Sequence, residues 1–550
     1  MVEGPNSRQG MPAASDRGAV RGSLLALGAA LLLGAGLRLW MITHAEVIAR
    51  DGIGYVATAR ALSIAPADAM RTSRVHPGYP GALAAMRGLA VWLGAPEETA
   101  WDQAGQIVSL AAGLAATVAI WAFAAMAFNW RIAWMTALLT SVARKWAALG
   151  ADVLGDALAV CWQLWAVVAA MAALRLLPRN RSSALLPAAL TGLCAGAGYL
   201  VRPEAMVVLV LAVAMWLAFP LRGAGWRRRL AAAVAAITVA ACVAAPYVAV
   251  TGRLTNKTDL FEAVRLPAGS GVAGCLATID PAGWAGQVFS ALHRAMDLFF
   301  EAQQPVLGSL TLICLGAYLA RRWPRLEALR RVLPVPAADG TFLMVGLTVA
   351  FMSLSMANYL RLGAMSYRYL MPCALLLSPL AVATVLGAAA LIRPLLSKLR
   401  RGALLSKALS QLLVALIAAG LLLHSLRPPH EGKGGYRQAG EFLRSVAGAG
   451  DFVLTDEGWV LHYSGLKGLV CHRPFTRRLL ASLLRAKRAT YLAIGDSAVD
   501  DSDPSLLNLG SQTGFVKLGQ FASKTSGHRE TVRVYCVEAA VPASQSAPSR

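Results

Sequence analysis

The first concentration of reactive side chains follows the first long apolar segment of the chain. Glu46 and Asp51 come directly after that segment, and Tyr55 follows within the next few residues. A carboxylate at the point where a helix leaves a membrane is partly shielded from water, so its pKa and basicity are easily tuned. The position suits a general base. A solvated loop containing Arg50-Asp51-Gly52 would look the same in isolation, so the rest of the chain has to decide.

The composition is that of a membrane protein. Of 550 residues, 57% are hydrophobic and 15% are charged, and the mean hydropathy is +0.54. A soluble protein is rarely so apolar. Apolar segments of about twenty residues, each long enough to cross a bilayer, recur about eleven times. They cover residues 24–42, 106–128, 133–149, 154–174, 184–200, 206–219, 230–250, 306–320, 342–356, 373–392 and 404–423, of which the third, sixth and ninth are marginal.

The positive charges fall mainly in alternate loops. Lys and Arg number 52 against 29 Asp and Glu, a net charge of +23. Alternation of this kind is the positive-inside pattern, so nucleic acid is not needed to explain the charge. It predicts a cytoplasmic N-terminus and an extracytoplasmic C-terminus. Arg144 and Lys145, near the outer end of the third segment, are an exception. Most acids before residue 427 fall on the outer side, which indicates where chemistry occurs.

Four short motifs supply that outer side with complementary groups. Acids come from the first three motifs and arginines from the first, third and fourth. Each also has a local alternative: a helix boundary at Pro203, a helix N-terminus at Asp156, and an interfacial anchor at Arg368. Together they offer a base and a clamp for phosphate. The motifs are Arg50-Asp51-Gly52 with Tyr55 and His76-Pro77-Gly78-Tyr79-Pro80, Ala151-Asp152-Val153-Leu154-Gly155-Asp156, Tyr199-Leu200-Val201-Arg202-Pro203-Glu204, and Ser366-Tyr367-Arg368-Tyr369-Leu370-Met371-Pro372.

The C-terminal part changes character after about residue 427. Helical patterns at 436–446, 457–463 and 475–485 alternate there with strand patterns at 451–455, 490–494 and 531–537. This alternation predicts a small extracytoplasmic α/β domain. The predicted division is a cytoplasmic tail at 1–21, a membrane domain at 22–426, the α/β domain at 427–538 and a disordered tail at 539–550. Cys471 and Cys536 lie in the α/β domain and could pair if the compartment is oxidising. The fold class predicted overall is mainly α, a polytopic membrane protein with a small C-terminal α/β domain.

From residue 24 to about residue 423, the arrangement of these motifs resembles the GT-C superfamily of membrane glycosyltransferases, in particular bacterial relatives of protein O-mannosyltransferases and the aminoarabinose transferase of lipid A. The resemblance implies transfer of a sugar from a polyprenyl-phosphate carrier to a glycan, lipid or protein acceptor at the outer face of a bacterial inner membrane. It also implies an essential acid in the first outer loop, which by motif position is Asp51. Protein O-mannosyltransferases have adjacent Asp and Glu there, whereas Gly52 follows Asp51, so a protein acceptor of that kind is less supported.

The resemblance assigns roles that fit the chemistry of such a transfer. Asp51 is the expected base of an inverting displacement, and arginines suit the departing phosphate because their planar donors match its oxygens. A divalent ion such as Mg²⁺ or Mn²⁺ between Asp51 and Asp152 or Asp156 stays open. The remaining expectations are phosphate or donor contacts at Arg202, Arg368, Tyr367 and Tyr369, supporting acids at Glu46, Asp152, Asp156 and Glu204, and acceptor or loop residues at Tyr55, His76 and Tyr79.

The alternatives are a non-catalytic assembly protein and a transporter, of which a flippase of lipid-linked sugars is the strongest. A flippase would need the same grip on phosphate. Transporters usually carry ionisable groups near the middle of the bilayer and show inverted repeats. Neither feature is evident in this sequence, which favours the transferase.

Overall fold

The structure is a computed structural model, which describes residues 14–179, 181–218, 223–256, 281–320, 336–362, 365–396, 402–471, 475–487, 489–499, 504–511, 514–523 and 530–537. Its contacts divide the chain into two units. The first comprises Met1–Trp40 and Thr58–Leu426, and the second comprises Met41–Ala57 and Arg427–Arg550. The second unit therefore takes in the segment that carries Glu46 and Asp51. Each unit is described by itself.

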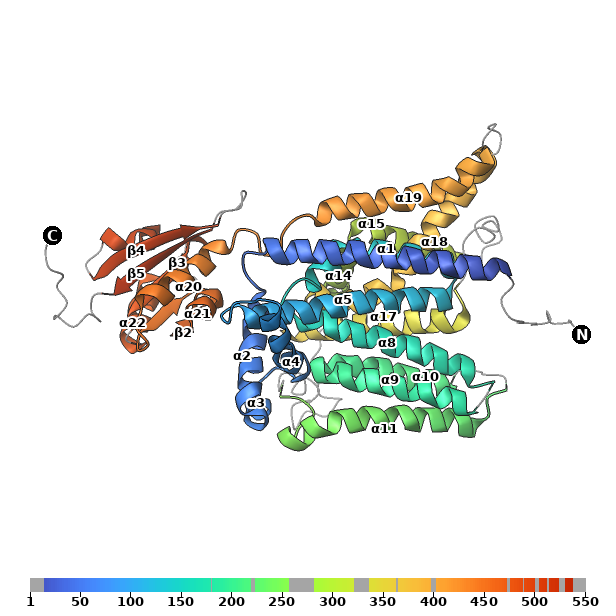
Figure 1. The fold of residues 1–550 in the computed structure, drawn as a ribbon, viewed down its shortest axis with the longest axis horizontal. Helices are drawn as coiled ribbons and strands as arrows, with labels where there is room; N and C mark the ends of the chain where they lie inside the picture. Colours follow the sequence, from blue (N-terminus) through green and yellow to red (C-terminus); the bar gives the residue numbers. More distant parts are fainter. Residues whose placement is uncertain are drawn as a thin grey trace, which may run out of the picture. The chain divides into compact units, whose positions relative to one another are not determined.

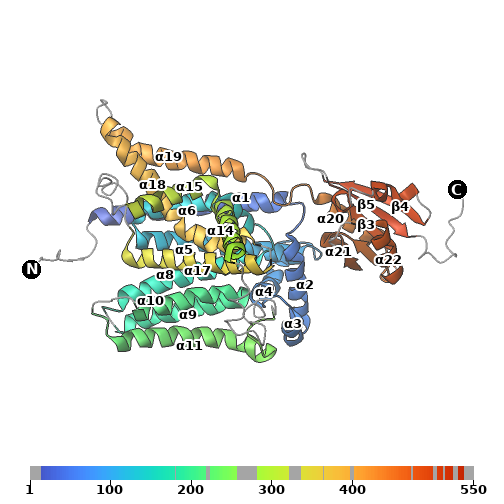
Figure 2. The same ribbon diagram turned by 180° about the vertical axis from the view of Figure 1, so that it is seen from behind.

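The first unit is a bundle of long helices (Figures 1 and 2). Helix α8 packs against α5 and α9, and α9 packs in turn against α11. The elements of the first unit are α1 (Ala14–His44), α2 (Arg50–Ile64), α3 (Pro66–Thr72), α4 (Gly78–Trp92), α5 (Ala100–Ala127), α6 (Trp130–Val142), α7 (Arg144–Leu149), α8 (Gly155–Leu176), α9 (Arg181–Val201), η1 (Pro203–Ala205), α10 (Met206–Ala218), α11 (Trp226–Thr251), α14 (Pro281–Gln303), α15 (Pro305–Ala320), α17 (Ala338–Leu362), η3 (Tyr367–Leu370), α18 (Met371–Leu396) and α19 (Gly402–Ser425). The C-terminal end of α1, from Met41, and the start of α2, as far as Ala57, belong to the second unit.

The membrane spans follow the hydrophobic pattern of the sequence. Among the described residues, eight helices are long and apolar enough to cross a membrane, or nine if α14 and α15, bent by 115° at their junction, form one broken span. The remaining two predicted segments are helices α6 and α10, which have only 13 residues each. The predicted fold class, a polytopic and mainly helical membrane protein, is confirmed.

The third predicted segment is interrupted for a local reason. Asn129 caps the start of α6, where its side-chain oxygen accepts hydrogen bonds from the N–H groups of Arg131 and Ile132. Such a cap satisfies donors that the first helical turn leaves without partners. At the other end, Ala143 adopts an extended conformation with φ −66° and ψ 120°, so the helix stops and α7 starts anew. One apolar segment thus becomes two helices.

A buried arginine ties α1 to its neighbours. Arg38 has no exposed surface, and its Nη1 donates hydrogen bonds to the carbonyl oxygens of Gly34 (2.9 Å) and Ser141 (3.1 Å). Its bulk fits because glycines face it: a Cβ at Gly150 would lie 2.6 Å from Nε, and one at Gly113 would lie 3.0 Å away. A side chain at either glycine would therefore displace the guanidinium.

The second unit is built on a five-stranded mixed sheet. The strand order is β2-β1-β3-β5-β4, in which β1 is parallel to β2 and β3, while β5 is antiparallel to β3 and β4. Its elements are α20 (Gly434–Val446), β1 (Phe452–Thr455), α21 (Gly458–Ser464), β2 (Lys467–Val470), α22 (Arg477–Lys487), β3 (Tyr491–Gly495), η4 (Asp496–Ala498), η5 (Pro504–Ser511), β4 (Phe515–Ala522) and β5 (Thr531–Val537).

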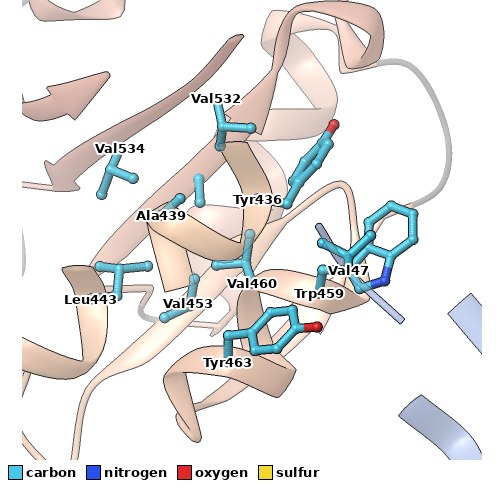
Figure 3. Packing of buried hydrophobic residues seen from close by; sticks show 11 residues of the cluster. Val47, Tyr436, Ala439, Leu443, Val453, Trp459, Val460, Tyr463, Val532 and Val534 are labelled. Atoms are coloured by element: carbon cyan, nitrogen blue, oxygen red, sulfur yellow. The ribbon is translucent and has the colours of Figure 1, made fainter. Parts of the chain in front are cut away.

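Two apolar layers enclose this sheet because successive strand residues point to opposite faces. Val453 of β1 belongs to the layer beneath α20 and α21, and the next residue, Leu454, belongs to the layer beneath α22 and η5. Figure 3 shows the first layer, in which Tyr436, Trp459 and Val460 pack together with Val47 from the segment before α2. The Trp459 Nε1–H also donates to the carbonyl of Ile48 at 2.7 Å. That segment is therefore part of this core.

The strand order also shows whether Cys471 and Cys536 can form a disulfide. Cys471 follows directly after β2, while Cys536 lies on β5. Strands β1 and β3 lie between them, so the two cysteines are separated by three strand spacings, or roughly 14 Å. A disulfide requires Cα atoms within about 7 Å. These two cysteines are not joined.

A polar cluster lies where the parallel strands end. The Tyr436 hydroxyl lies 2.6 Å from Oδ2 of Asp456 and 2.8 Å from Oε1 of Glu530. The Gly495 N–H donates to Oδ1 of Asp456 at 3.2 Å, and Lys433 pairs with Glu530. Burial raises the pKa of Asp456 to about 6 although these hydrogen bonds oppose the rise. Burial also acts to raise the pKa of Glu530, but its hydrogen bonds from Lys433, Ser497 and Tyr436 outweigh that effect and lower it.

Asp456→Asn should remove part of the pH dependence of this unit's stability. Because the pKa of Asp456 is raised in the folded state, this residue adds most to the free energy of unfolding below pH 4. That stabilisation is lost as the pH rises through 6, which lowers the free energy of unfolding by about 3 kcal/mol. Glu530, whose pKa is lowered, stabilises the folded state above pH 4.5 and loses that contribution as the pH falls below this value. Hydrogen-exchange protection factors of β1 and β3 in the full-length protein should fall between pH 4 and 6 in the wild type and stay level in Asp456→Asn.

Asp451→Asn is the matched control, because Asp451 lies in the same unit but is only partly buried. It should keep the wild-type profile. An Asp456→Asn profile that also follows the wild type would show that Asp456 does not titrate in this window.

Candidate active site

The first unit brings together an acid and two arginines from three distant parts of the sequence. Asp156, at the start of α8, has a side chain that is only 2% exposed. Its Oδ1 lies 2.8 Å from Nη2 of Arg202, and its Oδ2 lies 3.6 Å from Nη1 of Arg368. Such a buried carboxylate needs nearby positive charge, since an uncompensated ion in a protein interior is strongly unfavourable. Three of the residues proposed from the sequence therefore meet at one place.

The start of α8 is held by a chain of hydrogen bonds from α4 and α5. The Tyr79 hydroxyl lies 3.0 Å from the carbonyl of Gly105 and 2.8 Å from the Ser109 hydroxyl. The Ser109 hydroxyl also lies 3.1 Å from the carbonyl of Leu154, the residue just before α8. The packing leaves no space, because a Cβ at Gly105 would come within 2.6 Å of Val153. Tyr79 thus helps to fix the position of Asp156.

Arg202 is directed toward Asp156 by the proline that follows it. Proline disfavours a helical conformation in the preceding residue, so α9 ends at Val201 and Arg202 is extended, with φ −148° and ψ 126°. Pro203 then starts the 3-10 turn η1, which carries Glu204. The side chain of Arg202 is 14% exposed and its guanidinium lies 5.7 Å from the centre of the Tyr369 ring, a cation–π distance.

Arg368 is held more loosely than Arg202. It lies on η3, where the side chain of the N-cap residue Ser366 accepts a hydrogen bond from the backbone N–H of Arg368. The Ser366 hydroxyl also accepts a hydrogen bond from Nε of Arg368 at 3.3 Å. The side chain of Arg368 is 28% exposed, twice the value for Arg202, and its contact with Asp156 is longer. Of the two arginines, Arg368 is the better placed to bind a further anion.

Lys145 joins this group although it was not among the predicted site residues. Its Nζ lies 4.6 Å from the centre of the Tyr367 ring and 2.6 Å from Oε1 of Glu301. The sequence did contain a feature that could have identified Lys145, because this residue is an exception to the positive-inside pattern. A cation that the loop charges predict to lie on the outer side, against that pattern, is a candidate for function.

A pocket of about 270 Å³ opens beside the acid and the arginines. Its walls come from α8, η1, α17, η3 and the start of α18. Its polar lining consists of Asp156, Gln163, Arg202, Glu204, Arg368 and Tyr369.

Three predicted residues lie in the interior of the first unit, away from the lining of this pocket. Asp152 is 5% exposed and its Oδ1 accepts a hydrogen bond from the N–H of Val153 at 2.7 Å. His76 is 1% exposed, and its ring packs against Tyr199 and Tyr247, while Nε2 lies 2.8 Å from the Thr255 hydroxyl. Tyr79, described above, is fully buried. The contacts of these three residues therefore link neighbouring segments of the first unit.

The other three predicted residues belong to the second unit. Glu46 accepts hydrogen bonds from the N–H groups of Gly432 (3.2 Å) and Gly434 (2.9 Å), and so caps the start of α20. Asp51 is exposed in the first turn of α2, next to Arg50, which pairs with Glu457. Tyr55 is partly buried on the same helix.

Asp51 and the Asp156 cluster thus belong to different units. Within the part of the chain that the structure describes, no three His, Cys, Asp or Glu side chains converge as metal ligands. The carboxylate of Asp156 is already opposed by two guanidinium groups. No step of the mechanism below is routed through a metal.

Comparison with known proteins rests on structure. No protein-family model matches the sequence, and no curated protein matches it. The fold is similar to archaeal oligosaccharyltransferase AglB from Archaeoglobus fulgidus, solved with an inhibitory peptide and a dolichol-phosphate: TM-score 0.56 and 14% identity over 86% of this chain and 69% of that one. A structure of the same oligosaccharyltransferase with zinc and sulfate has TM-score 0.55 and 12% identity, over 94% and 74%.

A second similar protein matches the chain over nearly its whole length. ArnT from Cupriavidus metallidurans, bound to undecaprenyl phosphate, has TM-score 0.52 and 14% identity over 98% of this chain and 100% of that one. The chain is therefore a polytopic membrane protein with a C-terminal α/β unit, and its fold is that of the GT-C glycosyltransferases, as the sequence motifs predicted. At these identities the likeness establishes the fold, and activity has to be argued from the site.

Proposed function

We propose that this protein is an inverting glycosyltransferase that moves a sugar from a polyprenyl-phosphate carrier to an acceptor at the outer face of a bacterial inner membrane. The observation that carries the proposal is the pocket in which Asp156 holds Arg202 and Arg368 beside polar groups. An arginine with a partly exposed guanidinium matches a phosphate leaving group. The two similar proteins, solved with dolichol-phosphate and undecaprenyl phosphate, support a lipid phosphate as ligand.

The reaction needs a base and a leaving-group stabiliser. The carboxylate of Asp51 takes the proton from an acceptor hydroxyl as the hydroxyl oxygen attacks the anomeric carbon of the sugar. The bond between that carbon and the phosphate oxygen breaks, and the lipid phosphate departs with the electron pair. Because a lipid phosphate is already a good leaving group, cations suffice to stabilise its charge. Arg368 supplies that charge, while Asp156 and Ser366 hold Arg368 in place.

Lys145 is a second cation available to the phosphate. It lies against Tyr367, the neighbour of Arg368, but shares its charge with Glu301. A divalent ion such as Mg²⁺ or Mn²⁺ would help to neutralise the departing phosphate, but Asp156 is already paired with two arginines and Asp152 does not line the pocket, so we assign no ligands to such an ion. The orientation follows the loop charges, with the N-terminus in the cytoplasm and residues after 427 outside.

The direct test is incubation of the purified full-length protein in lipid nanodiscs with a panel of radiolabelled polyprenyl-phosphate sugars. Release of bare lipid phosphate with transfer of label to water or to an acceptor glycan, lipid or peptide is the expected result. Binding of the carriers and their movement between leaflets with no bond cleavage for any sugar would contradict the proposal and support a flippase.

Arg368→Ala should weaken binding of a polyprenyl-phosphate sugar by roughly 2 kcal/mol, or about thirtyfold, because a charge-assisted hydrogen bond is lost at a partly buried site. Arg368→Lys should fall between this variant and the wild type, since lysine keeps the charge but loses the planar pair of donors. Equilibrium binding to correctly inserted, monodisperse protein measures both.

Arg60→Ala is the control for Arg368, because Arg60 is an exposed arginine of α2 that does not line the pocket. It should bind as the wild type does. If Arg368→Ala also keeps wild-type affinity, the phosphate contact would pass to Arg202 or Lys145.

A further inference from the structure

The pocket has an inner end that the reaction described above does not use. Asp156 and Gln163 both lie on α8 seven residues apart, which is two helical turns or about 10 Å along the axis. Ala159 and Val160 line the pocket between them, so one face of α8 forms a continuous wall. The arginines meet this wall at Asp156, and Gln163 marks its other end within a membrane-spanning helix.

Outside the ion-paired cluster of Asp156, Arg202 and Arg368, two residues that line this pocket each have a buried polar atom without a hydrogen-bond partner among the described residues. These atoms are Oε1 of Gln163 and Oε2 of Glu204. Gln163 is 4% exposed and Glu204 is 7% exposed. A buried polar atom without a partner is unfavourable, and polar side chains within membrane spans usually serve a function for that reason. Both residues line the pocket, so a ligand within it can supply the missing hydrogen bonds.

The chemistry of these two atoms identifies the part of the donor that they can bind. A carboxylate oxygen only accepts hydrogen bonds, whereas the amide of Gln163 can turn to present either its carbonyl or its NH₂ group. A hydroxyl group is both a donor and an acceptor, so it satisfies either residue. An isoprenoid chain offers no hydrogen bond, and a phosphate would be repelled by the carboxylate of Glu204. A polyhydroxylated ring is the match.

We propose that Gln163 and Glu204 bind hydroxyl groups of the donor sugar and determine which sugar the protein accepts. This inference rests on the proposed function. It places the lipid phosphate at Arg368 and the sugar ring along α8 toward Gln163.

The test compares bare undecaprenyl phosphate with the same lipid carrying mannose, glucose or arabinose. For the wild type, the sugar-bearing lipid with the best fit should bind more tightly than the bare lipid. Gln163→Met, which keeps the length of the side chain, and Glu204→Gln should each reduce that preference about 10- to 100-fold. Their affinity for the bare lipid should stay within about twofold of the wild type, and that binding also reports that each variant is folded.

Gln106→Met is the matched control, because Gln106 is another buried glutamine on a membrane-spanning helix but does not line the pocket. It should keep the full preference. Deoxy analogues of the preferred sugar add a specific check: removing the hydroxyl that Gln163 binds should weaken binding to the wild type and have little further effect in Gln163→Met.

The two hypotheses fail in different ways. Wild-type protein that binds neither the bare nor the sugar-bearing lipids would overturn the proposed function and this inference with it. Wild-type protein that prefers one sugar, with the same preference in Gln163→Met and Glu204→Gln, would overturn this inference alone.

Discussion

Replacement of Asp51 by Asn should lower the rate of sugar transfer by about two to four orders of magnitude while leaving the affinity for the donor nearly unchanged. Asparagine keeps the size of the side chain but cannot take a proton at neutral pH. The exposed position of Asp51 in the first turn of α2 leaves room for an acceptor hydroxyl. Single-turnover transfer and equilibrium donor binding, measured on the same preparation, separate the chemical step from binding.

Two variants serve as controls for Asp51→Asn. Asp68→Asn changes another exposed acid, on α3, and should keep full activity. Glu46→Gln removes a carboxylate that accepts hydrogen bonds from Gly432 and Gly434, so it should weaken the second unit more than it slows the chemistry. Near-normal transfer by Asp51→Asn would refute its role as base. The base would then have to be sought at Asp156 or elsewhere, and the transferase proposal would lose its main mechanistic support.

Much of the architecture could be predicted because it follows from local sequence. The apolar segments give the spans, since length and hydropathy decide whether a helix can cross a bilayer. The patterns at 436–446, 451–455 and 531–537 correspond to α20, β1 and β5. The end of α9 at Val201 follows from Pro203 alone. These features depend on neighbours in the sequence and therefore need no knowledge of the fold.

Features that depend on tertiary contacts could not be predicted in the same way. Val47 and Ile48 contribute to the core of the second unit, almost 400 residues before its main part. Strand β2 has only four residues and includes Gly468, so its strand pattern is weak. Strand β4 carries mostly exposed and half-buried residues, and its register shifts between Lys517 and Gly519. Both gain their structure from the strands beside them.

In the candidate site, too, some residues could be predicted from the sequence and others could not. The motifs around Asp156, Arg202 and Arg368 could be recognised because acids and arginines are rare in so apolar a chain, and the fold brings them together. Gln163 and Lys145 were missed although each is a local exception: Gln163 is a polar residue within a span, and Lys145 is a cation on the predicted outer side. Their roles depend on what faces them, which sequence alone does not state.

Removal of Asp156 should destabilise the first unit by about 3 to 5 kcal/mol, because Arg202 and Arg368 would be left in a buried site without an opposing charge. Asp156→Ala should therefore lower the temperature at which the purified protein loses its monodisperse form. The double variant Asp156→Leu with Arg202→Met should recover much of that loss, since it removes the acid together with its closest partner.

The exposed pair Asp68 and Arg71 is the matched control for this buried cluster. Their side chains are 75% and 58% exposed, so Asp68→Ala should change stability by less than about 1 kcal/mol. The stability and the activity of the double variant should also diverge: a recovered melting temperature with lost donor binding would mean that Asp156 and Arg202 position Arg368 for its ligand. If Asp156→Ala is as stable as the wild type, the two arginines already find another counter-charge, and Glu204, beside them in the pocket, would be the residue to test next.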